Sequence, residues 1–372
     1  MTPDPMVLDM GRQFSAERLA PGAAAREKAG RIEPEIIAEL GELGILGATT
    51  SADWDGSDLD PVTYALLLEE IAAGDGAVST LVSVHNSPTC VVLDKFGTDA
   101  QKDRWLRPLA AGRHVGSFGL TEPQAGSDAS NLRTRAVRRG GRWIVNGAKQ
   151  FISNAALPGS IVFFAVTDPD AGKKGISCFV ADKSTPGFKI LRVEEKLGQK
   201  ASDTCALAFE DMELPEDQLV GREGEGYKIA LSTLESGRIG IAAQSVGMAR
   251  AALDFAIGYA RDRTAFGRPI IDHQAVAFRL VEAKTRLEAA RQMTLHAARL
   301  KAGGEPALEA ACMAKLFASE AAEAVCTAAI QTLGGYGFLS DYPVERIYRD
   351  VRVCQIYEGT SDVQKLILQR ML

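Results

Sequence analysis

The sequence predicts an α+β protein in which a helical segment, a β segment and a second helical segment follow one another. Three observations predict this order. Apolar residues recur at helical spacing up to about residue 112, short β runs separated by turn residues fill residues 113–225, and long alanine-rich helical runs fill residues 226–372. We expect a domain in each of these ranges, because 372 residues exceed what one compact core usually holds.

Composition limits the class of protein. Apolar residues make up 46% of the chain and charged residues 24%, which is typical of a globular protein. The net charge of −6 argues against a general nucleic-acid binder, and no apolar run approaches the roughly 20 residues that span a bilayer. The first ten residues carry two aspartates and no basic cluster, unlike a signal or transit peptide. We therefore expect a cytoplasmic protein without a membrane span.

Cysteine and histidine usage predicts a reduced protein without a metal site. The six cysteines are far apart in sequence, and none forms a CxxC pair. Most of them lie in apolar runs, where a buried thiol is expected. No two of the four histidines stand at the spacing of metal ligands. We expect neither a disulfide framework nor a bound metal.

Residues that start and end helices predict that the first segment is helical. Pro34 opens an apolar run of helical period, and Gly44 ends it. After a loop of turn-forming residues, Pro61 stands at the first position of the next helix, where proline is tolerated. Residues 78–96 and 101–109 continue the helical pattern.

Turn residues between short β runs predict hairpins in the middle segment. Gly140 and Gly141 join two short β runs, and Asn146 with Gly147 predicts a second hairpin between residues 143–145 and 150–152. The simplest account is an antiparallel, all-β middle domain. Four further β runs are residues 161–167, 176–181, 188–193 and 205–209.

The last segment predicts a helical bundle. Residues 226–261, 273–301 and 306–333 are long runs of helical period, and the third is crowded with alanine. Alanine permits close approach of neighbouring helices. Gly334 and Gly335 end the third run, so three long helices and the closing ones form a bundle.

A break between two helices near the C-terminus is the candidate for chemistry. The spacing of apolar residues predicts a helix over residues 344–354 and another from residue 361 onward. Glu358 and Gly359 lie between them, where a carboxylate can leave the helix surface and a glycine lets a ligand approach the backbone. Taken alone, the spacing also fits an ordinary helix end.

Four further glycine-rich or polar stretches lie at the borders of the segments: residues 118–128, 151–154, 261–274 and 331–337. Hydroxyls and free backbone N–H groups of the first can hold a polar ring edge or an anion. Arginines of the third can bind a pyrophosphate. Each stretch taken alone also fits an ordinary loop, strand end or helix cap.

Together and in this order, the stretches resemble the acyl-CoA dehydrogenase family of flavoproteins. The motifs TEPxAGSD at 121–128, RxxFGxPIxxHQ at 263–274, QxxGGxGF at 331–338 and YEGTSxxQ at 357–364 carry the resemblance, which runs from about residue 36 to the end. It implies an N-terminal helical domain, a middle β-barrel and a C-terminal four-helix bundle. It also implies a homotetramer that binds FAD between domains and across a subunit interface.

The resemblance implies that Glu358 is the catalytic base. Other members carry the base directly before the arginine that matches Arg238, where this sequence has Gly237, so Glu235 is expected to be a helix-surface residue. The backbone N–H of Glu358 would also bind the thioester carbonyl, beside Gly359. Burial next to an acyl chain is expected to raise the pKa of Glu358 towards neutrality. The implied substrate contacts are Ser127, Glu235, Gly237, Arg238, Glu358 and Gly359.

The implied FAD contacts fall into three groups. Around the flavin ring they are Phe118, Leu120, Thr121, Ser127, Phe151, Ile152 and Ser153; around the pyrophosphate and adenosine half, partly in a neighbouring subunit, they are Arg263, Phe266, Gln274, Gln331, Leu333, Gly334 and Gly335; near the adenine they are Thr360 and Asp362. Phe151 replaces the tryptophan of many members but keeps an aromatic face. The loop at residues 53–60 departs from the family sequence.

The resemblance therefore implies an FAD-dependent acyl-CoA dehydrogenase. It would remove an α-proton and a β-hydride, the hydride going to flavin N5, and make a trans-2-enoyl-CoA for fatty-acid β-oxidation or amino-acid breakdown. Electrons would pass to electron-transferring flavoprotein. Gly237 with Glu358 favours short- or medium-chain substrates, straight or branched. Two alternatives stay open: an acyl-CoA oxidase or flavin monooxygenase of the same fold, and an inactive assembly scaffold.

Overall fold

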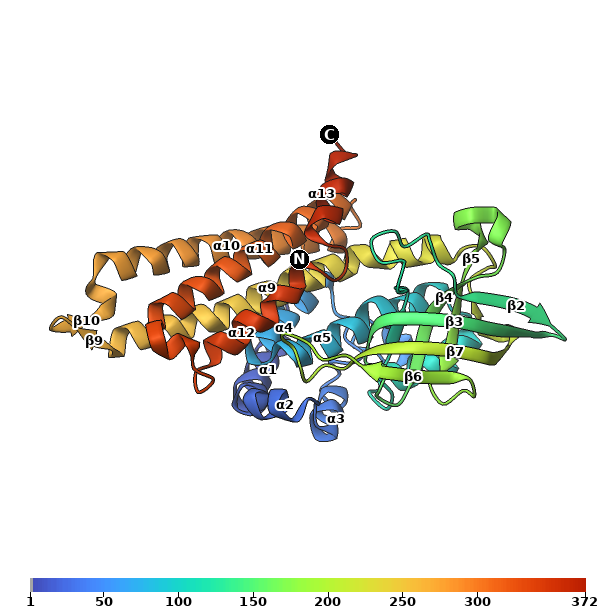
Figure 1. Cartoon of the computed structure of the whole chain (residues 1–372), viewed down its shortest axis with the longest axis horizontal. Coiled ribbons are helices and arrows are strands. Elements are labelled where there is room, and N and C mark those ends of the chain that lie inside the picture. The colour runs from blue at the N-terminus through green and yellow to red at the C-terminus, as the bar shows by residue number, and fades with distance from the viewer. Residues whose placement is uncertain (1–2) are drawn as a thin grey trace.

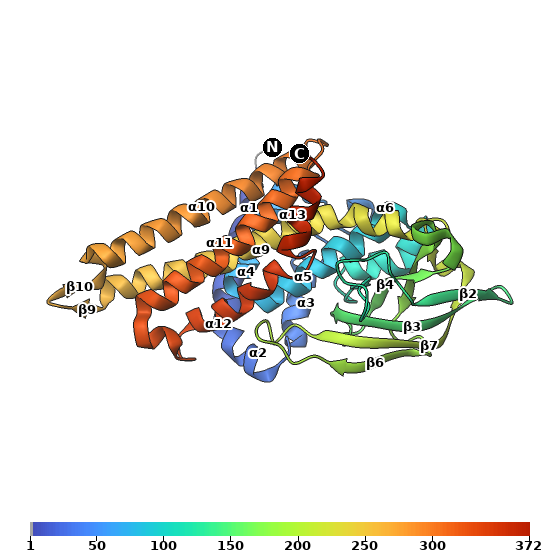
Figure 2. The same cartoon turned by 45° about the horizontal axis from the view of Figure 1, so that its top comes forward.

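The structure is a computed structural model that describes residues 3–372. The first two residues of the expected N-terminal domain lie outside that range. Two helical parts flank a β-sheet, which confirms the helical, β, helical order (Figure 1). The long C-terminal helices form one end of the elongated molecule and the sheet forms the other, and the N-terminal helices pack beside both (Figure 2).

The N-terminal part is built from short helices with well-defined starts. Asp60 accepts hydrogen bonds from the N–H groups of Val62 and Thr63, and Pro61 occupies the first helical position as predicted. A π-helical stretch (His85–Cys90) containing Pro88 interrupts the predicted helix at 78–96. The helices of this part are α1 (Pro5–Phe14), α2 (Ala23–Ala29), α3 (Pro34–Glu42), α4 (Pro61–Gly74), α5 (Gly76–Val84), α6 (Val91–Phe96), α7 (Asp99–Gln101) and α8 (Arg107–Ala110).

The middle part is an eight-stranded sheet with the order β6-β7-β3-β2-β4-β5-β8 and β1 beside β4. Pairing is mostly antiparallel, but β1 and β2 both pair with β4 in parallel, which the sequence did not indicate. The hydrogen-bonded path is open between β6 and β8, so closure into a barrel stays a prediction. The strands are β1 (Ser117–Gly119), β2 (Arg135–Arg139), β3 (Arg142–Ser153), β4 (Ser160–Val166), β5 (Ile176–Asp182), β6 (Phe188–Val193), β7 (Thr204–Pro215) and β8 (Leu219–Val220).

One predicted hairpin is wrong. Gly140 and Gly141 do turn the chain between β2 and β3, but Asn146 and Gly147 lie inside β3, which runs on unbroken to Ser153. The pairing of β3 with β7 shifts register between Val145 and Gly147, as in a β-bulge. Glycine fits there because its φ is 153° and a Cβ would lie 2.4 Å from the Thr134 hydroxyl oxygen. The same pair of residues that signals a hairpin therefore also suits a bulge.

The strands β4 and β5 are buried on both faces, which explains their continuous apolar runs. On one face, Val162 and Phe164 pack with residues of α6, α8 and the start of α9 (Gly226–Asp262). On the other face, Phe163 and Phe179 pack against β3 and β7, with Phe163 and Phe209 ring centroids 4.7 Å apart. The sheet therefore bends over its own core while its outer face is covered by helices.

The C-terminal part is a bundle whose long helix α9 also contacts the sheet and the N-terminal helices. Buried alanines of α11 pack against α9 and α10, which allows the close approach that the sequence predicted. A small hairpin of β9 and β10 forms the tip of the bundle away from the sheet (Figure 1). Besides α9, the elements are β9 (Thr264–Ala265), β10 (Arg268–Pro269), α10 (Gln274–Ala302), α11 (Leu308–Leu333), α12 (Pro343–Val351) and α13 (Ser361–Gln369).

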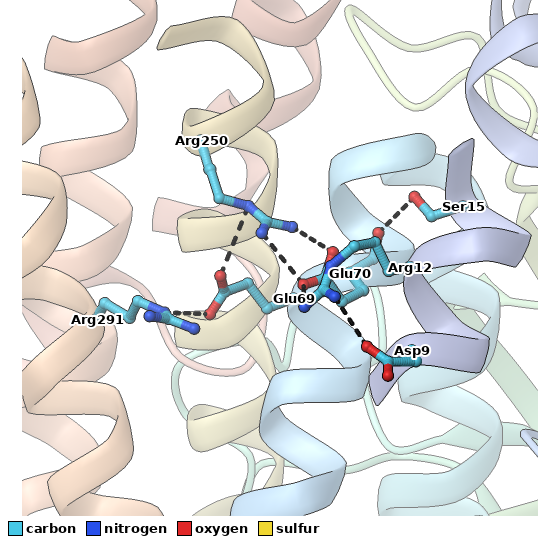
Figure 3. Close-up of polar contacts among 7 residues, drawn as sticks. All are labelled: Asp9, Arg12, Ser15, Glu69, Glu70, Arg250 and Arg291. Atoms are coloured by element: carbon cyan, nitrogen blue, oxygen red, sulfur yellow. Dashed lines mark hydrogen bonds and ion pairs between the residues drawn. The ribbon is translucent and has the colours of Figure 1, made fainter. Parts of the chain in front are cut away.

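A network of charges joins the N-terminal helices to the bundle (Figure 3). Glu69 and Glu70 are buried neighbours on α4. Arg250 of α9 lies 2.6 Å from Glu70 and 3.6 Å from Glu69, and Arg291 of α10 lies 2.9 Å from Glu69. Arg12 of α1 completes the network at 3.7 Å from Glu70. Four helices are therefore tied together around two carboxylates.

The six cysteines are free and buried. No helix within residues 3–372 has the length and apolar character needed to cross a bilayer.

Candidate active site

Glu358 lies in the turn between the last two helices. A short 3-10 helix ends at Gln355, and α13 begins at Ser361, with the Thr360 hydroxyl accepting a hydrogen bond from the N–H of Val363 at 3.2 Å. Glu358 and Gly359 have φ angles of 55° and 89°, so both adopt the left-handed conformation. Two successive left-handed residues reverse the chain and turn the Glu358 side chain inward.

The carboxylate of Glu358 lacks a hydrogen-bond partner. The residue as a whole is half-buried, but its Oε2 atom is shielded from solvent and accepts no hydrogen bond from residues 3–372. Burial raises the pKa of Glu358 to about 7, against the opposing charges of Arg238 and Lys315. A carboxylate with this pKa can accept a proton near neutral pH.

Gly237 of α9 lies directly against this carboxylate. A Cβ atom added at Gly237 would lie 2.5 Å from Oε2 of Glu358, so only glycine leaves room for the acid group in its present position. A side chain at position 237 would enter the space that the Glu358 side chain fills. Glu235, two residues earlier, does not reach this space, because it is half-buried and forms an ion pair with Lys301 at 3.0 Å.

Two donors hold the main chain of the turn. The Lys315 ammonium group donates to the Gly359 carbonyl at 2.7 Å, and the Gln364 side-chain amide donates to the same carbonyl at 2.9 Å and to that of Glu358 at 3.2 Å. Sequence reasoning missed Lys315, and it included Gln364 in the motif at 357–364 without giving it a role. The only signal for Lys315 was one lysine inside an alanine-rich helix.

A buried polar cluster lies behind the turn. Tyr357 donates to the Gln244 side chain at 3.2 Å, and Gln244 donates to Ser79 at 2.6 Å and to Thr80 at 3.0 Å. Gln199 from the middle part joins them through Thr80 at 2.5 Å. The cluster therefore connects α5, α9, the loop after β6 and the turn that carries Glu358, and sequence reasoning missed it as well.

Two of the predicted cofactor stretches lie side by side at the sheet. The N–H of Gln150, next to Phe151, donates to the Thr121 carbonyl at 2.9 Å. Thr121 is half-buried, Ser127 is exposed, and the ring of Phe118 packs edge-on against Phe164. The two stretches can therefore face one bound ring system.

Phe151 is the most exposed of these residues. Its side chain is 64% exposed and its φ is 59°, a conformation that an aromatic residue rarely adopts. Ser153, two residues on, is half-buried. Ile152 and Leu120 lie in the core, so only their main-chain atoms could contact a ligand.

A buried ion pair between Lys149 and Glu122 anchors the loop at residues 118–128. Lys149 of β3 is fully buried and donates to Glu122 at 2.7 Å and to the Leu120 carbonyl at 3.3 Å. Glu122 also accepts hydrogen bonds from the N–H groups of Arg133 and Thr134. Burial alone would raise the pKa of Glu122, but the charge of Lys149 and these hydrogen bonds hold it below its usual value.

The third group of predicted cofactor residues lies at the far end of the bundle. Arg263, Leu333, Gly334 and Gly335 line a cavity of about 370 Å³ together with Tyr336, whose ring lies 5.7 Å from the Arg263 guanidinium. The Leu333 side chain itself is buried. Phe266 at the β9–β10 tip, Gln274 and Gln331 are exposed nearby.

Within a single chain, the three sets of predicted cofactor residues do not lie together. The tip with Phe266 lies at the end of the bundle opposite the sheet that carries Phe151 (Figure 1). Thr360 and Asp362 stand at the start of α13, between the two. Asp362 is exposed, whereas Thr360 is half-buried and caps the helix.

A second cavity, which sequence reasoning missed, opens at the start of α9. It has a volume of about 480 Å³ and is lined by Lys173, Lys174, Tyr227, Lys228 and Ser232 among others. The Lys173 ammonium lies 5.2 Å from the centre of the Tyr227 ring. Three lysines make this cavity suited to an anion.

Comparison with known proteins extends over the whole chain. Three family models match, described as "Acyl-CoA dehydrogenase, N-terminal domain" at residues 4–113, "middle domain" at 117–212 and "C-terminal domain" at 224–372. An acyl-CoA dehydrogenase of Bacillus subtilis is 43% identical over 367 residues, covering 99% of this chain and 97% of that protein.

Two solved structures share the fold closely. Butyryl-CoA dehydrogenase from Megasphaera elsdenii has a TM-score of 0.97 at 39% identity, covering 100% of this chain and 99% of the other. A chain in a structure described as the electron transferring flavoprotein of Acidaminococcus fermentans has a TM-score of 0.96 at 44% identity, covering 98% and 96%. With its fold, its buried glutamate and these matches, this protein belongs to the acyl-CoA dehydrogenase family of flavoprotein oxidoreductases.

Proposed function

We propose that this protein is an FAD-dependent acyl-CoA dehydrogenase that converts a short- or medium-chain acyl-CoA to the trans-2-enoyl-CoA. One observation carries the proposal: the Glu358 carboxylate is buried, unpartnered and raised in pKa to about 7 beside a glycine. A buried carboxylate without a partner is costly, so its retention indicates a ligand or a reaction that uses it.

Glu358 acts as the general base in this proposal. Its carboxylate removes the α-proton of the acyl thioester, so the Cα–H bond breaks and an O–H bond forms. The N–H of Glu358 donates to no acceptor among residues 3–372, which leaves it free to bind the thioester carbonyl as negative charge develops there. Bound FAD would supply the acceptor for the hydride that leaves the β-carbon. Gly359, which has no side chain, leaves room for the thioester.

The residues around the sheet fit a flavin ring. Phe151 offers an exposed aromatic face, and the joined stretches 118–128 and 151–153 offer hydroxyls and main-chain groups at one place. We assign the flavin contacts to Phe118, Leu120, Thr121, Ser127, Phe151, Ile152 and Ser153, with Leu120 and Ile152 acting through main-chain atoms. Ser127 would also contact the substrate.

The remaining cofactor residues fit a site shared between subunits. Because they lie at the far end of the bundle from Phe151, we propose that they hold the pyrophosphate and adenosine half of the FAD of a neighbouring copy. These residues are Arg263, Phe266, Gln274, Gln331, Leu333, Gly334 and Gly335, with Thr360 and Asp362 near the adenine.

We propose that the protein forms a homotetramer, and exposed apolar surface supports contact between copies. Large apolar side chains on the bundle are exposed in the single chain, among them Phe266 (98%), Phe338 (86%) and Val281 (60%). Exposed apolar surface of this kind is typical of protein interfaces. We propose that other copies of the chain cover it.

The face of α9 next to Glu358 favours a short acyl chain. Gly237, Gly240 and Gln244 lie on one face of the helix, at spacings of three and four residues. From Gly237 to Gln244 the helix rises by about 10 Å. An acyl chain that leaves Glu358 along this face therefore soon meets the buried cluster of Gln244 and Tyr357, which an alkyl chain would have to desolvate.

The other end of the substrate is proposed to run along α9 in the opposite direction. Arg238 is buried, and its Nε has no partner among residues 3–372, so it is poised for a polar group of the CoA portion. Lys228 precedes Gly237 by nine residues, or about 14 Å of helix. The lysine-lined cavity there fits the phosphates of CoA. Glu235 lies between the two and is proposed to line the path.

The proposal also covers the domain bounds, the form of the middle domain, the electron acceptor and the location. We propose domains at 1–112, 113–225 and 226–372, supported by the first strand at Ser117 and the start of α9 at Gly226. Packing of β3 and β7 onto β4 and β5 supports a barrel-like middle domain. Electron-transferring flavoprotein is proposed as the acceptor and the cytoplasm as the location, supported by the flavoprotein structure matched above and by the bacterial relative.

Anaerobic titration of the purified protein with a panel of acyl-CoAs tests the proposal. We expect flavin bleaching by butyryl-CoA, weaker bleaching as the chain lengthens, and a product two hydrogens lighter by mass spectrometry. Absence of bleaching with every acyl-CoA would overturn the proposal. Fast peroxide formation in air would instead indicate an oxidase.

A further inference from the structure

Lys315 is a fully buried lysine whose partner is the catalytic turn. It lies on α11, among alanines, and none of its surface is exposed. A buried ammonium group is costly unless it is partnered. Within residues 3–372 it forms no ion pair closer than 4.0 Å, and its hydrogen bond goes to the Gly359 carbonyl at 2.7 Å. The ammonium group of Lys315 therefore donates to a neutral carbonyl next to Glu358 and not to a carboxylate.

The turn needs such an anchor. Glu358 has a φ of 55°, which is unfavourable for a residue with a side chain. The directions of its carboxylate and of its N–H depend on this conformation, because rotation about the N–Cα bond of Glu358 turns the side chain relative to the N–H. Lys315 from α11 and Gln364 from α13 hold the Gly359 carbonyl, and Gln364 also holds the Glu358 carbonyl. The two peptide units that follow Glu358 are therefore fixed, which opposes that rotation.

Charge adds a second effect. The groups that face the Glu358 carboxylate are Arg238 from α9 and Lys315 from α11. Glu235 is paired with Lys301 of α10, and Cys354 and Glu320 lie near Lys315. Burial lowers the pKa of Lys315 to about 8, so the side chain is still mainly cationic at neutral pH. A cation here favours the ionised form of the base.

We propose that Lys315 is a positioning residue for the reaction: it fixes the turn through the Gly359 carbonyl, so that the Glu358 carboxylate and N–H keep their directions, and its charge keeps the base ionised. The inference rests on the proposed function. Lys315 then has two effects, positioning of the turn and a charge effect on Glu358, which different substitutions can separate.

The test compares Lys315→Met and Lys315→Arg with the wild-type holoenzyme in anaerobic single turnovers with butyryl-CoA. For Lys315→Met we expect retained flavin, a bleaching rate constant at least about tenfold lower, and little change in the butyryl-CoA concentration that gives half the maximal rate. The acidic limb of the pH profile should move up by about one pH unit, because the cation that favours ionised Glu358 is lost. Lys315→Arg keeps the charge, so it should slow bleaching while leaving that limb in place.

Hydrogen exchange supplies a readout independent of turnover. The amides of residues 358–361 should exchange faster in Lys315→Met than in wild type. Lys183 provides a matched control, since it also donates to main-chain carbonyls, those of Asn154 and Leu157, but in the middle part. Lys183→Met should lower stability while leaving the pH limb and exchange at 358–361 unchanged.

The outcomes distinguish a failure of the proposed function from a failure of the proposed role of Lys315. If the wild-type protein is not bleached by butyryl-CoA, the proposed function is wrong. If the wild type is bleached and Lys315→Met keeps its rate constant, pH limb and exchange, the role of Lys315 is wrong. Should Lys315→Met fail to fold, Lys315→Arg decides, and an unaltered rate constant in that variant would overturn the positioning role.

Discussion

At the scale of single residues, the site depends on how closely Gly237 and Glu358 approach. The carboxylate fills the space that a side chain at position 237 would need, and burial there raises the pKa of Glu358 to about 7. One glycine therefore serves two purposes: it admits the acid group, and it leaves that position without an acid of its own.

Gly237→Ala should displace the base. The added methyl group would lie 2.5 Å from Oε2 of Glu358, closer than two unbonded atoms can approach, so the carboxylate must move. A displacement of about 1 Å costs on the order of 100-fold in rate. We expect kcat with butyryl-CoA to fall by at least about tenfold while bound flavin is retained. Gly258→Ala on the same helix, where an added Cβ meets nothing within 4 Å, is the control and should keep its kcat.

The raised pKa of Glu358 also predicts a pH-dependent stability difference. A carboxyl group with a folded-state pKa near 7 stabilises the fold most below its unfolded pKa of about 4.3, and this contribution is lost as pH rises through 7. Glu358→Gln does not titrate. The variant should therefore gain stability over wild type between pH 5 and pH 8, by about 1–3 kcal/mol. Urea unfolding at the two pH values measures it; an identical difference at both would contradict the burial of a charged base.

At the scale of elements, the loop at 118–128 depends on a buried ion pair rather than on its own turn residues. Lys149 of β3 reaches Glu122 and the Leu120 carbonyl, and Glu122 binds two further N–H groups. The loop and the end of β3 are therefore one unit, which places Thr121 beside Phe151.

Lys149→Met should destabilise the protein by about 3–5 kcal/mol, because it leaves the Glu122 charge buried without a partner. Flavin retention should fall as well. Urea unfolding gives the free energy, and adding Glu122→Gln to the variant should recover part of the loss. Lys189→Met removes an exposed pair with Glu210 and should cost less than about 1 kcal/mol. Equal losses in the two lysine variants would argue against a buried pair.

Elements with strong local signals could be predicted from the sequence. Pro61 and Asp60 mark the start of α4, Gly334 ends α11, and the Gly140–Gly141 turn joins β2 to β3. Asn146 with Gly147 misled because a bulge and a hairpin favour the same residues, and only pairing with β7 decides between them. The parallel pairing of β1 with β4 joins strands more than 40 residues apart and has no local signal.

The same limit applies to the candidate site. Glu358 lies in a motif, Gly237 and Arg238 follow from the family resemblance, and the structure brings these three together. Lys315 and the Gln244 cluster were missed, since their roles come from contacts with residues distant in sequence. Gln364 ends the motif at 357–364, but the motif alone does not show that its amide holds the turn. A lysine in a helix gives no sign of whether it faces solvent or a main-chain carbonyl.

At the scale of the whole molecule, buried charges tie the N-terminal helices to the bundle. Glu69 and Glu70 share Arg250, and Arg291 and Arg12 extend the contact to α10 and α1 (Figure 3). α9 packs between these helices and the turn that carries Glu358, so the network supports the helix that carries Gly237.

Arg250→Met should cost about 3 kcal/mol of unfolding free energy, because two adjacent buried carboxylates lose their shared cation. Arg18→Met is a suitable comparison, as its pair with Glu39 is largely exposed and should contribute much less to stability. Urea unfolding of both variants at pH 7 gives the two values. The network would have no special role if Arg250→Met cost no more than Arg18→Met.

The most direct measurement of the central claim is anaerobic flavin bleaching by butyryl-CoA in Glu358→Gln. This variant keeps the size of the side chain and the N–H of residue 358 but cannot accept the α-proton. The account predicts a folded, flavin-bound protein whose bleaching rate constant falls by at least about 100-fold, the lower end of the range for losing a general base. Bleaching at the wild-type rate in that variant would contradict it.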